Sequence, residues 1–255
     1  RNQGIAVVLN IFYGTIVNSA YGIAQQVLGA VQFISTSILN AMNPQIMKAE
    51  GSGDRSRMVR LCEYESKYAF LLLSLVAIPL IAEMDTVLHF WLGEVPEHAV
   101  MFCRCILAAS LCDQISVGLT TANQAVGKIR TYNLIFYTFK LLVIVFAWGC
   151  IKAGLPLVSV MWCYIGVELF TSLLRLPLMK RIANIAILPF CKNVFLKIIV
   201  PATTMSIVCY ISICYINLSW RIILTILLSA ATGLLSIWIT SLEKEEKQHI
   251  TQLIK

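Results

Sequence analysis

Polar residues in two places lie within stretches that are otherwise apolar, and these are the residues that could carry chemistry. In hydrocarbon a polar side chain needs a protein partner or a wet cavity, because lipid offers it no hydrogen bond. The first group falls on one face of a helix expected over residues 16–43, since positions three or four apart share a helix face. Its side chains are Asn18, Gln25, Gln32, Thr36 and Asn40, with Gly22 and Gly29 among them.

This polar stripe has two interpretations. In one, its small and amide residues pack against neighbouring helices and hydrogen-bond to them. In the other, they line a hydrophilic cavity that takes up a polar substrate. The stripe runs for about five helical turns, which is longer than one helix contact requires and therefore favours the cavity.

The second group is ionisable and comprises Asp113, Lys140 and Glu168. Each falls about eight to ten residues from the same end of its expected helix, which at about 1.5 Å per residue places all three at one depth. A lysine alone near mid-membrane costs at least about 2.5–3.5 kcal/mol. We therefore expect Lys140 to pair with Glu168, and Asp113 to share or exchange with that pair.

The ionisable group also has two interpretations. It is either a static ion pair that joins three helices, or a working site. In the second case Lys140, together with Arg104, offers positive charge to an anionic substrate, or one of the carboxylates takes up a proton or Na⁺ during a transport cycle.

The composition indicates a membrane protein. Of 255 residues, 58% are apolar and 13% are charged, against about 45–50% and about 25% in an average soluble domain. The mean hydropathy of +0.79 agrees, since so few ionic groups cannot cover a water-exposed surface. The nine cysteines form no CxxC pair, and most lie in apolar runs as small hydrophobic residues. No Ser-His-Asp set, phosphate-binding loop or metal-ligand spacing occurs, so we expect no enzyme activity, cofactor or metal site.

The apolar stretches predict an all-α polytopic bundle of transmembrane helices. A helix needs about 20 residues to cross about 30 Å of hydrocarbon. A half-length stretch over residues 4–13 comes first. The long stretches cover residues 16–43, 67–84, 98–122, 131–151, 156–178, 196–216 and 221–241.

The charged residues are sorted between alternate connections. The connection over residues 85–97 carries no Lys or Arg, and the later ones on its side carry only Lys152 and Arg221. By the positive-inside rule the basic connections and the C-terminus are cytoplasmic. The net charge of +7 then faces anionic lipid headgroups rather than nucleic acid. The basic residues are Lys48, Arg55, Arg57, Arg60, Lys67, Lys128, Arg130, Arg175, Lys180, Arg181, Lys192, Lys197, Lys244, Lys247 and Lys255.

Several local motifs resemble a known family of membrane proteins. They are Asn-Ile-Phe-Tyr-Gly at 10–14, Val-Asn-Ser-Ala-Tyr-Gly-Ile-Ala-Gln-Gln-Val at 17–27, Asn-Pro-Gln-Ile-Met-Lys at 43–48, Trp-Leu-Gly-Glu-Val-Pro-Glu at 91–97 and Ala-Asn-Gln-Ala-Val-Gly-Lys at 122–128. Together they are similar to the second half of oligosaccharide flippases of O-antigen and capsular polysaccharide synthesis, in the superfamily that includes the MATE drug exporters. The resemblance covers residues 1–180, and the last two helices match only in hydropathy.

The resemblance implies a MATE-like C-terminal lobe. Residues 1–181 would form helices seven to twelve, the first of them truncated, and residues 182–241 the additional helices thirteen and fourteen. Residues 242–255 would form a cytoplasmic tail. The chain opens without Met or a signal-peptide pattern, so we interpret it as a C-terminal fragment whose partner is the missing N-terminal lobe.

The function implied by the resemblance is ATP-independent flipping of undecaprenyl-pyrophosphate-linked oligosaccharides across the bacterial inner membrane, by alternating access. A MATE-type exporter of cationic drugs, driven by Na⁺ or H⁺, is one alternative, and a truncated, non-functional fragment is another. In a flippase, amides would receive sugar hydroxyls and cations would receive phosphate. Those roles would fall to Asn18, Gln25, Gln32 and Asn40 for the sugars, and to Lys140 and Arg104 for the phosphates.

Overall fold

The computed structural model describes residues 2–216, 220–242 and 246–247, except for the side chain of Ile34, and these ranges fold into helices without a β-strand. Within them, six helices are long and apolar enough to cross a membrane, or seven when the bent pair α4–α5 is counted as one span. The predicted all-α polytopic bundle is therefore confirmed, and the chain is a multi-pass membrane protein. Most of the predicted tail over 242–255 lies outside the described residues.

The helices are α1 (Asn2–Gly51), α2 (Arg55–Ala82), α3 (Met84–Leu92), α4 (Ala99–Gln114), α5 (Val117–Val126), α6 (Ile129–Lys152), α7 (Leu157–Ala183), α8 (Ile187–Phe190), α9 (Leu196–Tyr215) and α10 (Arg221–Ser236), with π-helical turns at Cys191–Phe195 and Ile237–Ser241.

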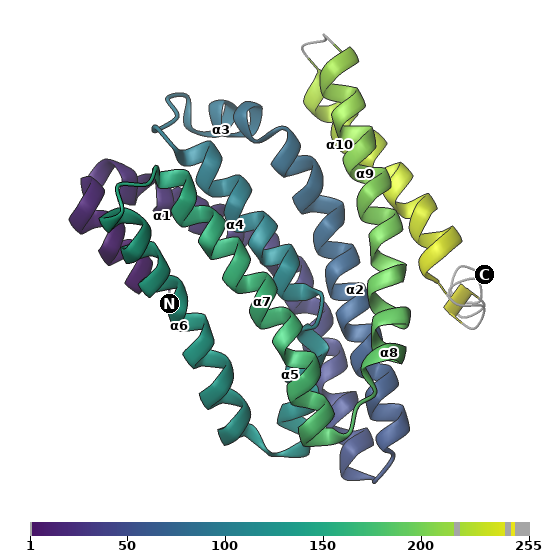
Figure 1. Cartoon of the computed structure of the whole chain (residues 1–255). Helices are drawn as coiled ribbons and strands as arrows, with labels where there is room; N and C mark the ends of the chain where they lie inside the picture. The colour runs from purple at the N-terminus through teal and green to yellow at the C-terminus, as the bar shows by residue number, and fades with distance from the viewer. Residues whose placement is uncertain (1, 217–219, 243–245, 248–255) are drawn as a thin grey trace.

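The helix α1 is two helices joined at Gly14. This glycine has φ 80° and ψ −174°, a backbone conformation that side chains with a Cβ disfavour. Asn2 Nδ2 donates to Gln25 Oε1 at 3.1 Å, whereas a straight helix would hold residues 23 apart at a distance of about 34 Å. The chain therefore reverses direction at Gly14, and the short segment before it agrees with the half-length stretch predicted over residues 4–13 (Figure 1).

The helix α2 begins at Arg55, three turns before the apolar stretch predicted at residue 67. Asp54 caps it, since its side chain accepts a hydrogen bond from Arg57 N at 3.0 Å. This backbone hydrogen bond, aided by Ser56, lowers the pKa of the Asp54 carboxyl below its ordinary value. Hydropathy locates the part of a helix that faces lipid, whereas the cap fixes where the helix begins. The predicted boundary was therefore wrong, and the basic residues that follow Arg55 lie on a helix.

The stretch predicted as one helix over residues 98–122 is broken. The helices α4 and α5 meet at an angle of 46°. Gly118, in the first turn of α5, lies against the backbone of α2, where its N–H donates to Ser66 Oγ at 2.9 Å. A Cβ built on Gly118 would lie 2.1 Å from the Cys62 carbonyl oxygen, so only glycine allows this approach.

The bundle has two apolar clusters with a polar layer between them. The first cluster includes Tyr21, Phe102 and Met161, and the second includes Ile46 and Tyr132. On each of α1, α2, α6, α7 and the α4–α5 pair, polar residues come between the members of the two clusters. These residues, which we call the polar layer, are Gln32, Ser35, Glu65, Ser66, Lys67, Ser110, Asp113, Ser116, Lys140, Glu168, Ser172 and Arg175.

The helices α9 and α10 lie at one edge of the bundle, with α9 against α2 and α10 against α9 (Figure 1). A charged clamp joins α10 to the end of α2. Arg221 donates to both carboxylate oxygens of Glu83 at 2.9 Å, and Thr225 donates to the same carboxylate at 3.1 Å. The division into a lobe over 1–181 and two further helices over 182–241 stays a prediction.

The Glu83 clamp predicts a pH dependence of stability. Burial raises the pKa of Glu83, but hydrogen bonds from Arg221, Thr86 and Thr225 outweigh it, and the net pKa lies below the ordinary 4.5. Because the folded pKa is below the unfolded one, the carboxylate stabilises the fold above about pH 4.5 and loses this effect as pH falls through the folded pKa. We expect unfolding temperatures measured across pH 3–6 to fall more steeply with acidification for the native chain than for Glu83→Gln. Parallel curves for the two proteins would contradict this origin, and the exposed Glu94→Gln is the control.

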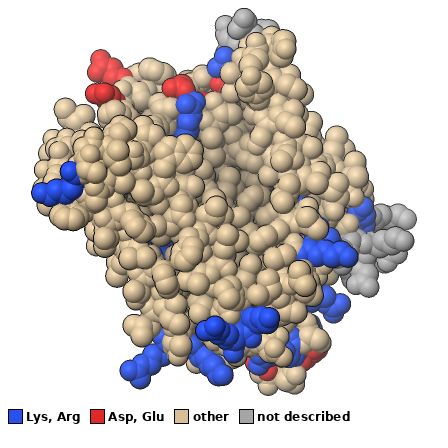
Figure 2. Space-filling model, in the orientation of Figure 1, with Lys and Arg blue, Asp and Glu red and all other residues tan. Residues whose placement is uncertain are grey.

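The basic side chains are distributed unequally between the two ends of the bundle. Figure 2 shows Lys and Arg gathered at the lower end, where the α1–α2, α5–α6 and α7–α8 connections lie in Figure 1. Acidic side chains are visible at both ends in that view, so the asymmetry between the ends is in Lys and Arg. The exposed basic residues of the three connections are Lys48, Arg55, Arg57, Arg60, Lys128, Arg130, Lys180 and Arg181.

Candidate functional site

An ionic cluster occupies the centre of the polar layer. Lys140 Nζ lies 3.0 Å from Asp113 Oδ1 and 3.1 Å from Glu168 Oε2. Arg175 Nη2 lies 2.7 Å from the same Asp113 oxygen, and its Nη1 donates to the Asp113 main-chain carbonyl at 2.7 Å. The structure thus brings Lys140 into contact with both carboxylates that the sequence placed at its depth. The cluster contains two cations and two carboxylates, so its charges balance.

The cluster is mostly closed to solvent. The side chains of Glu168 and Arg175 are each 4% exposed, and that of Lys140 is 14% exposed. Asp113 is the most accessible member, at 24%. Since a buried charge without a partner is costly, each cation of the cluster lies beside a carboxylate.

Arg175 does not lie where the sequence pattern predicts it. The pattern places it in a cytoplasmic connection, but α7 continues to Ala183 and Arg175 is buried within it. The assignment failed because the apolar stretch ends near residue 178, and a basic residue just inside that limit looks like part of the loop. The charge count is the signal that could have found Arg175. Two carboxylates, Asp113 and Glu168, share their depth with one lysine, so a second cation is needed to balance them.

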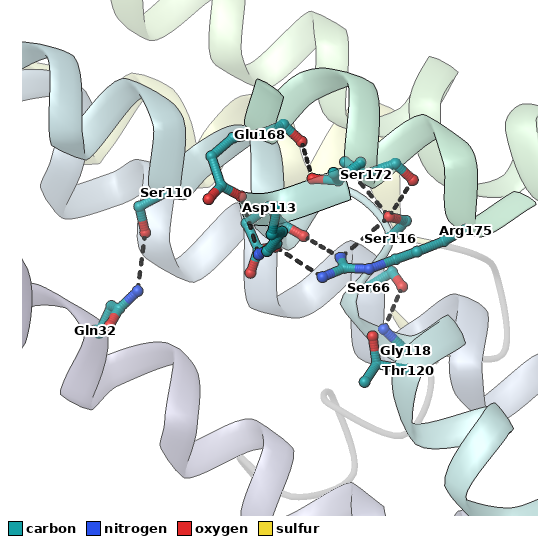
Figure 3. Close-up of polar contacts among 12 residues, drawn as sticks. Gln32, Ser66, Ser110, Asp113, Ser116, Gly118, Thr120, Glu168, Ser172 and Arg175 are labelled. Atoms are coloured by element: carbon teal, nitrogen blue, oxygen red, sulfur yellow. Dashed lines mark hydrogen bonds and ion pairs between the residues drawn. The ribbon is translucent and has the colours of Figure 1, made fainter. Parts of the chain in front are cut away.

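Neighbouring side chains hold the two cations in position. The Phe136 ring lies 4.7 Å from the Arg175 guanidinium carbon and 4.9 Å from Lys140 Nζ. Such cation–π contacts attract a cation electrostatically and limit its rotamers. Arg175 Nη1 also lies 3.3 Å from Ser116 Oγ, which in turn lies 2.8 Å from Ser172 Oγ, and Figure 3 shows the guanidinium reaching Asp113 and Ser116 together.

A small polar cavity of about 40 Å³ adjoins the cluster. A water molecule requires only about 10–15 Å³ on such a measure, so the cavity has room for water beside the charges. Gln32 Nε2 donates across it to Ser110 Oγ at 3.3 Å, as Figure 3 shows. Its lining residues are Leu28, Gln32, Ile106, Ala109, Ser110, Asp113, Lys140, Tyr164 and Glu168.

Most of the predicted polar stripe lies outside this cavity. Of its five side chains, Gln32 is the one that lines this cavity. Asn18 and Gln25 are half-buried, whereas Thr36 and Asn40 are exposed. The face of α1 that packs into the bundle is instead apolar, and its buried residues are Ala20, Tyr21, Ala24, Leu28 and Val31. The stripe therefore borders an open face of the described bundle.

Arg104 lies away from the cluster. Its guanidinium pairs with Asp85 at 2.7 Å and donates to the Ile81 carbonyl at 2.9 Å, so it fastens α4 to the corner between α2 and α3. The structure does not bring it to Lys140. The expected pairing overlooked Asp85, which the apolar stretches had placed in a connection and which lies on the short helix α3.

Two charged residues of α2, Glu65 and Lys67, are buried although their charges predict a connection. Glu65 accepts a hydrogen bond from Thr121 Oγ1 at 3.0 Å. Lys67 is expected in a basic connection, but it lies buried on α2, where its Nζ is 2.6 Å from Glu246 Oε1 and 4.8 Å from the ring centroids of Tyr64 and Tyr68. Hydropathy could not predict that these two side chains are buried, because it places charged residues in water. Cys62, Ala69 and Leu73 follow one another at intervals of seven and four residues, a spacing that places them on one helix face beginning before residue 67.

In comparisons with protein families, curated proteins and solved structures, nothing matches this chain.

Proposed function

We propose that this chain is the second half of an ATP-independent flippase of the bacterial inner membrane, which moves undecaprenyl-pyrophosphate-linked oligosaccharides during surface polysaccharide synthesis. The observation that supports it most is the ionic cluster of Asp113, Lys140, Glu168 and Arg175 beside a polar cavity with room for water. Ionisable groups within membrane helices are expensive, and they commonly mark a substrate or ion pathway.

The cluster suits an anionic ligand. Lys140 and Arg175 both approach one oxygen of Asp113, at 3.0 and 2.7 Å. A pyrophosphate oxygen carries the same charge and accepts the same charge-assisted hydrogen bonds as this carboxylate. In the proposed cycle the phosphate takes the place of Asp113, the most exposed member of the cluster, and Asp113 returns when the substrate leaves.

The polar stripe suits the sugar part of the substrate. Asn18, Thr36 and Asn40 are exposed or half-buried on the face of α1 that the described bundle leaves open. Amide and hydroxyl groups match the hydroxyls of a sugar, and lipid would leave both without hydrogen bonds. We propose that an N-terminal lobe, as the family resemblance implies, covers this face and encloses a shared cavity. The basic end of the bundle then faces the cytoplasm, with the C-terminus on the same side.

The exporter of cationic drugs is supported less well. It requires net negative charge in the cavity, whereas the cluster balances two carboxylates with Lys140 and Arg175. The third possibility, a non-functional fragment, does not require the ionic cluster. A transport measurement on the complete protein tests it.

Transport by a Lys140 variant tests the proposal. In the complete transporter that contains this chain, we expect Lys140→Ala to lower delivery of lipid-linked repeat units to the outer leaflet about tenfold, the equivalent of about 1.4 kcal/mol of lost interaction. Lys140→Arg keeps the charge and is expected to retain more activity. The measurement is surface polysaccharide together with repeat units accumulated inside the cell.

The control is Lys152→Ala, since Lys152 lies at the end of α6 with its ammonium 5.8 Å from the Trp148 ring. Membrane levels of each variant are compared by immunoblot. Native transport by a normally inserted Lys140→Ala protein would refute the role of Lys140, and native polysaccharide with altered dye efflux would favour the exporter.

A further inference from the structure

Two cysteines on consecutive helices lie in contact. Cys150 is near the end of α6 and Cys163 is in the second turn of α7, and their Sγ atoms are 3.5 Å apart. All nine cysteines fall within the described residues, and none of the other seven has its sulfur against a second cysteine there. The contact is thus specific to one pair.

The surroundings leave both side chains room to move. A disulfide has a sulfur–sulfur distance of about 2.05 Å, so the two atoms must approach by about 1.5 Å. Cys163 lines an apolar groove of about 410 Å³ between α6 and α7, together with Phe139, Phe146 and Phe170. The glycines beside the pair, Gly149 and Gly166, have no atom within 4 Å of a built Cβ. The groove and the open space at these glycines leave room beside the pair for small side-chain rotations.

The pair also lies near the surface of the membrane. Cys150 is two residues from the end of α6, about 3 Å along the axis, and Cys163 is six residues from the start of α7, about 9 Å. Lys152 packs over the Trp148 ring at this end, as aromatic and basic residues do at a membrane–water interface. The end is opposite the basic connections, so in the proposed orientation it faces the oxidising, outer side.

We propose that Cys150 and Cys163 are a modification site, where a reversible disulfide ties α6 to α7. The reaction is thiol–disulfide exchange with a disulfide oxidant. One thiolate attacks the oxidant and releases its first sulfur as a thiol. The second cysteine then attacks the mixed disulfide, the Cys150–Cys163 bond forms, and the second sulfur leaves as a thiol. The oxidant is reduced by two electrons, and the two cysteine protons end on its thiols.

Peptide mapping tests this proposal, because Lys152 lies between the two cysteines. Trypsin separates Leu141–Lys152, which contains Cys150, from Ala153–Arg175, which contains Cys163. We expect these peptides to stay linked after the full-length protein in membranes is treated with dithiodipyridine, and to separate on reduction. The linked mass is the sum of the two peptides less two hydrogen atoms.

Cys163→Ser is expected to abolish the linked peptide, and the matched Cys209→Ser, on α9, is expected to leave it unchanged. Wild-type protein should release one equivalent of thiopyridone more than Cys163→Ser when the link appears, because Cys150 alone releases one thiopyridone and keeps the second pyridyl sulfur as a mixed disulfide. Recovery of the two peptides unlinked, or pairing of Cys150 with other cysteines as often as with Cys163, would overturn the proposal. The readout needs no transport, so it stands apart from the proposed function.

Discussion

Replacing Arg175 with leucine is expected to destabilise the fold by about 3–5 kcal/mol, because it removes one partner of a buried ion pair. The guanidinium holds the Asp113 carboxylate at 2.7 Å and the Asp113 carbonyl at 2.7 Å, and both groups lie in a closed polar layer. Leucine leaves Asp113 and Glu168 to share Lys140, so the cluster acquires an uncompensated negative charge. The measurement is thermal unfolding in detergent, followed with a dye that fluoresces when buried cysteines become accessible.

Two further variants separate charge from packing. Arg181→Leu changes an exposed arginine of the same helix, and we expect a shift within about 0.5 kcal/mol. The double variant Arg175→Leu with Asp113→Leu removes the cation together with its carboxylate and should recover much of the loss. If Arg175→Leu unfolds at the temperature of Arg181→Leu, the cluster does not hold the bundle together.

The second large effect is expected at Gly118. Alanine there would place its Cβ 2.1 Å from the Cys62 carbonyl oxygen and 2.9 Å from the carbonyl carbon. These are main-chain atoms of α2, so no side-chain rotation relieves the clash and α5 must move away. We expect a loss at or above the upper end of the 1–3 kcal/mol typical of overpacked cores, that is, about 3 kcal/mol or more. The Gly118–Ser66 hydrogen bond would lengthen with it.

Gly166→Ala is the matched control, because it lies within α7 and its Cβ would meet no atom within 4 Å. Alanine favours a helix over glycine by about 0.8–1.0 kcal/mol, so this variant should be as stable as the native chain or slightly more so. Equal unfolding temperatures for Gly118→Ala and Gly166→Ala would show that α5 does not need its close approach to α2.

The fold class follows from the sequence because burial in lipid imposes a simple rule on composition. Long apolar runs must be helices when no water is present to satisfy the backbone. The rule says less about where a helix ends. Helix α2 extends three turns past its apolar run, and α7 continues to Ala183, because polar residues beyond the hydrocarbon remain helical.

The sequence predicts part of the candidate site. Depth along a helix is one-dimensional, so counting residues was enough to match Lys140 with Asp113 and Glu168. Direction around a helix depends on which neighbours it meets. The spacing therefore predicts a polar stripe on α1, but the packed bundle is needed to see that, of its side chains, Gln32 is the one that lines the cavity beside the cluster. The same holds for Arg104, whose partner Asp85 lies on a helix too short for a periodicity argument.

The bend between α4 and α5 also sets the chemistry of the ionic cluster. Asp113 stands in the last turn of α4, where main-chain carbonyls lack partners within the helix. Arg175 uses that carbonyl at 2.7 Å as well as the side chain. The α4–α5 bend and the Arg175–Asp113 ion pair are therefore mechanically coupled. Straightening the bend would remove the carbonyl acceptor from Arg175, and a ligand that draws Arg175 away would make the bend more flexible.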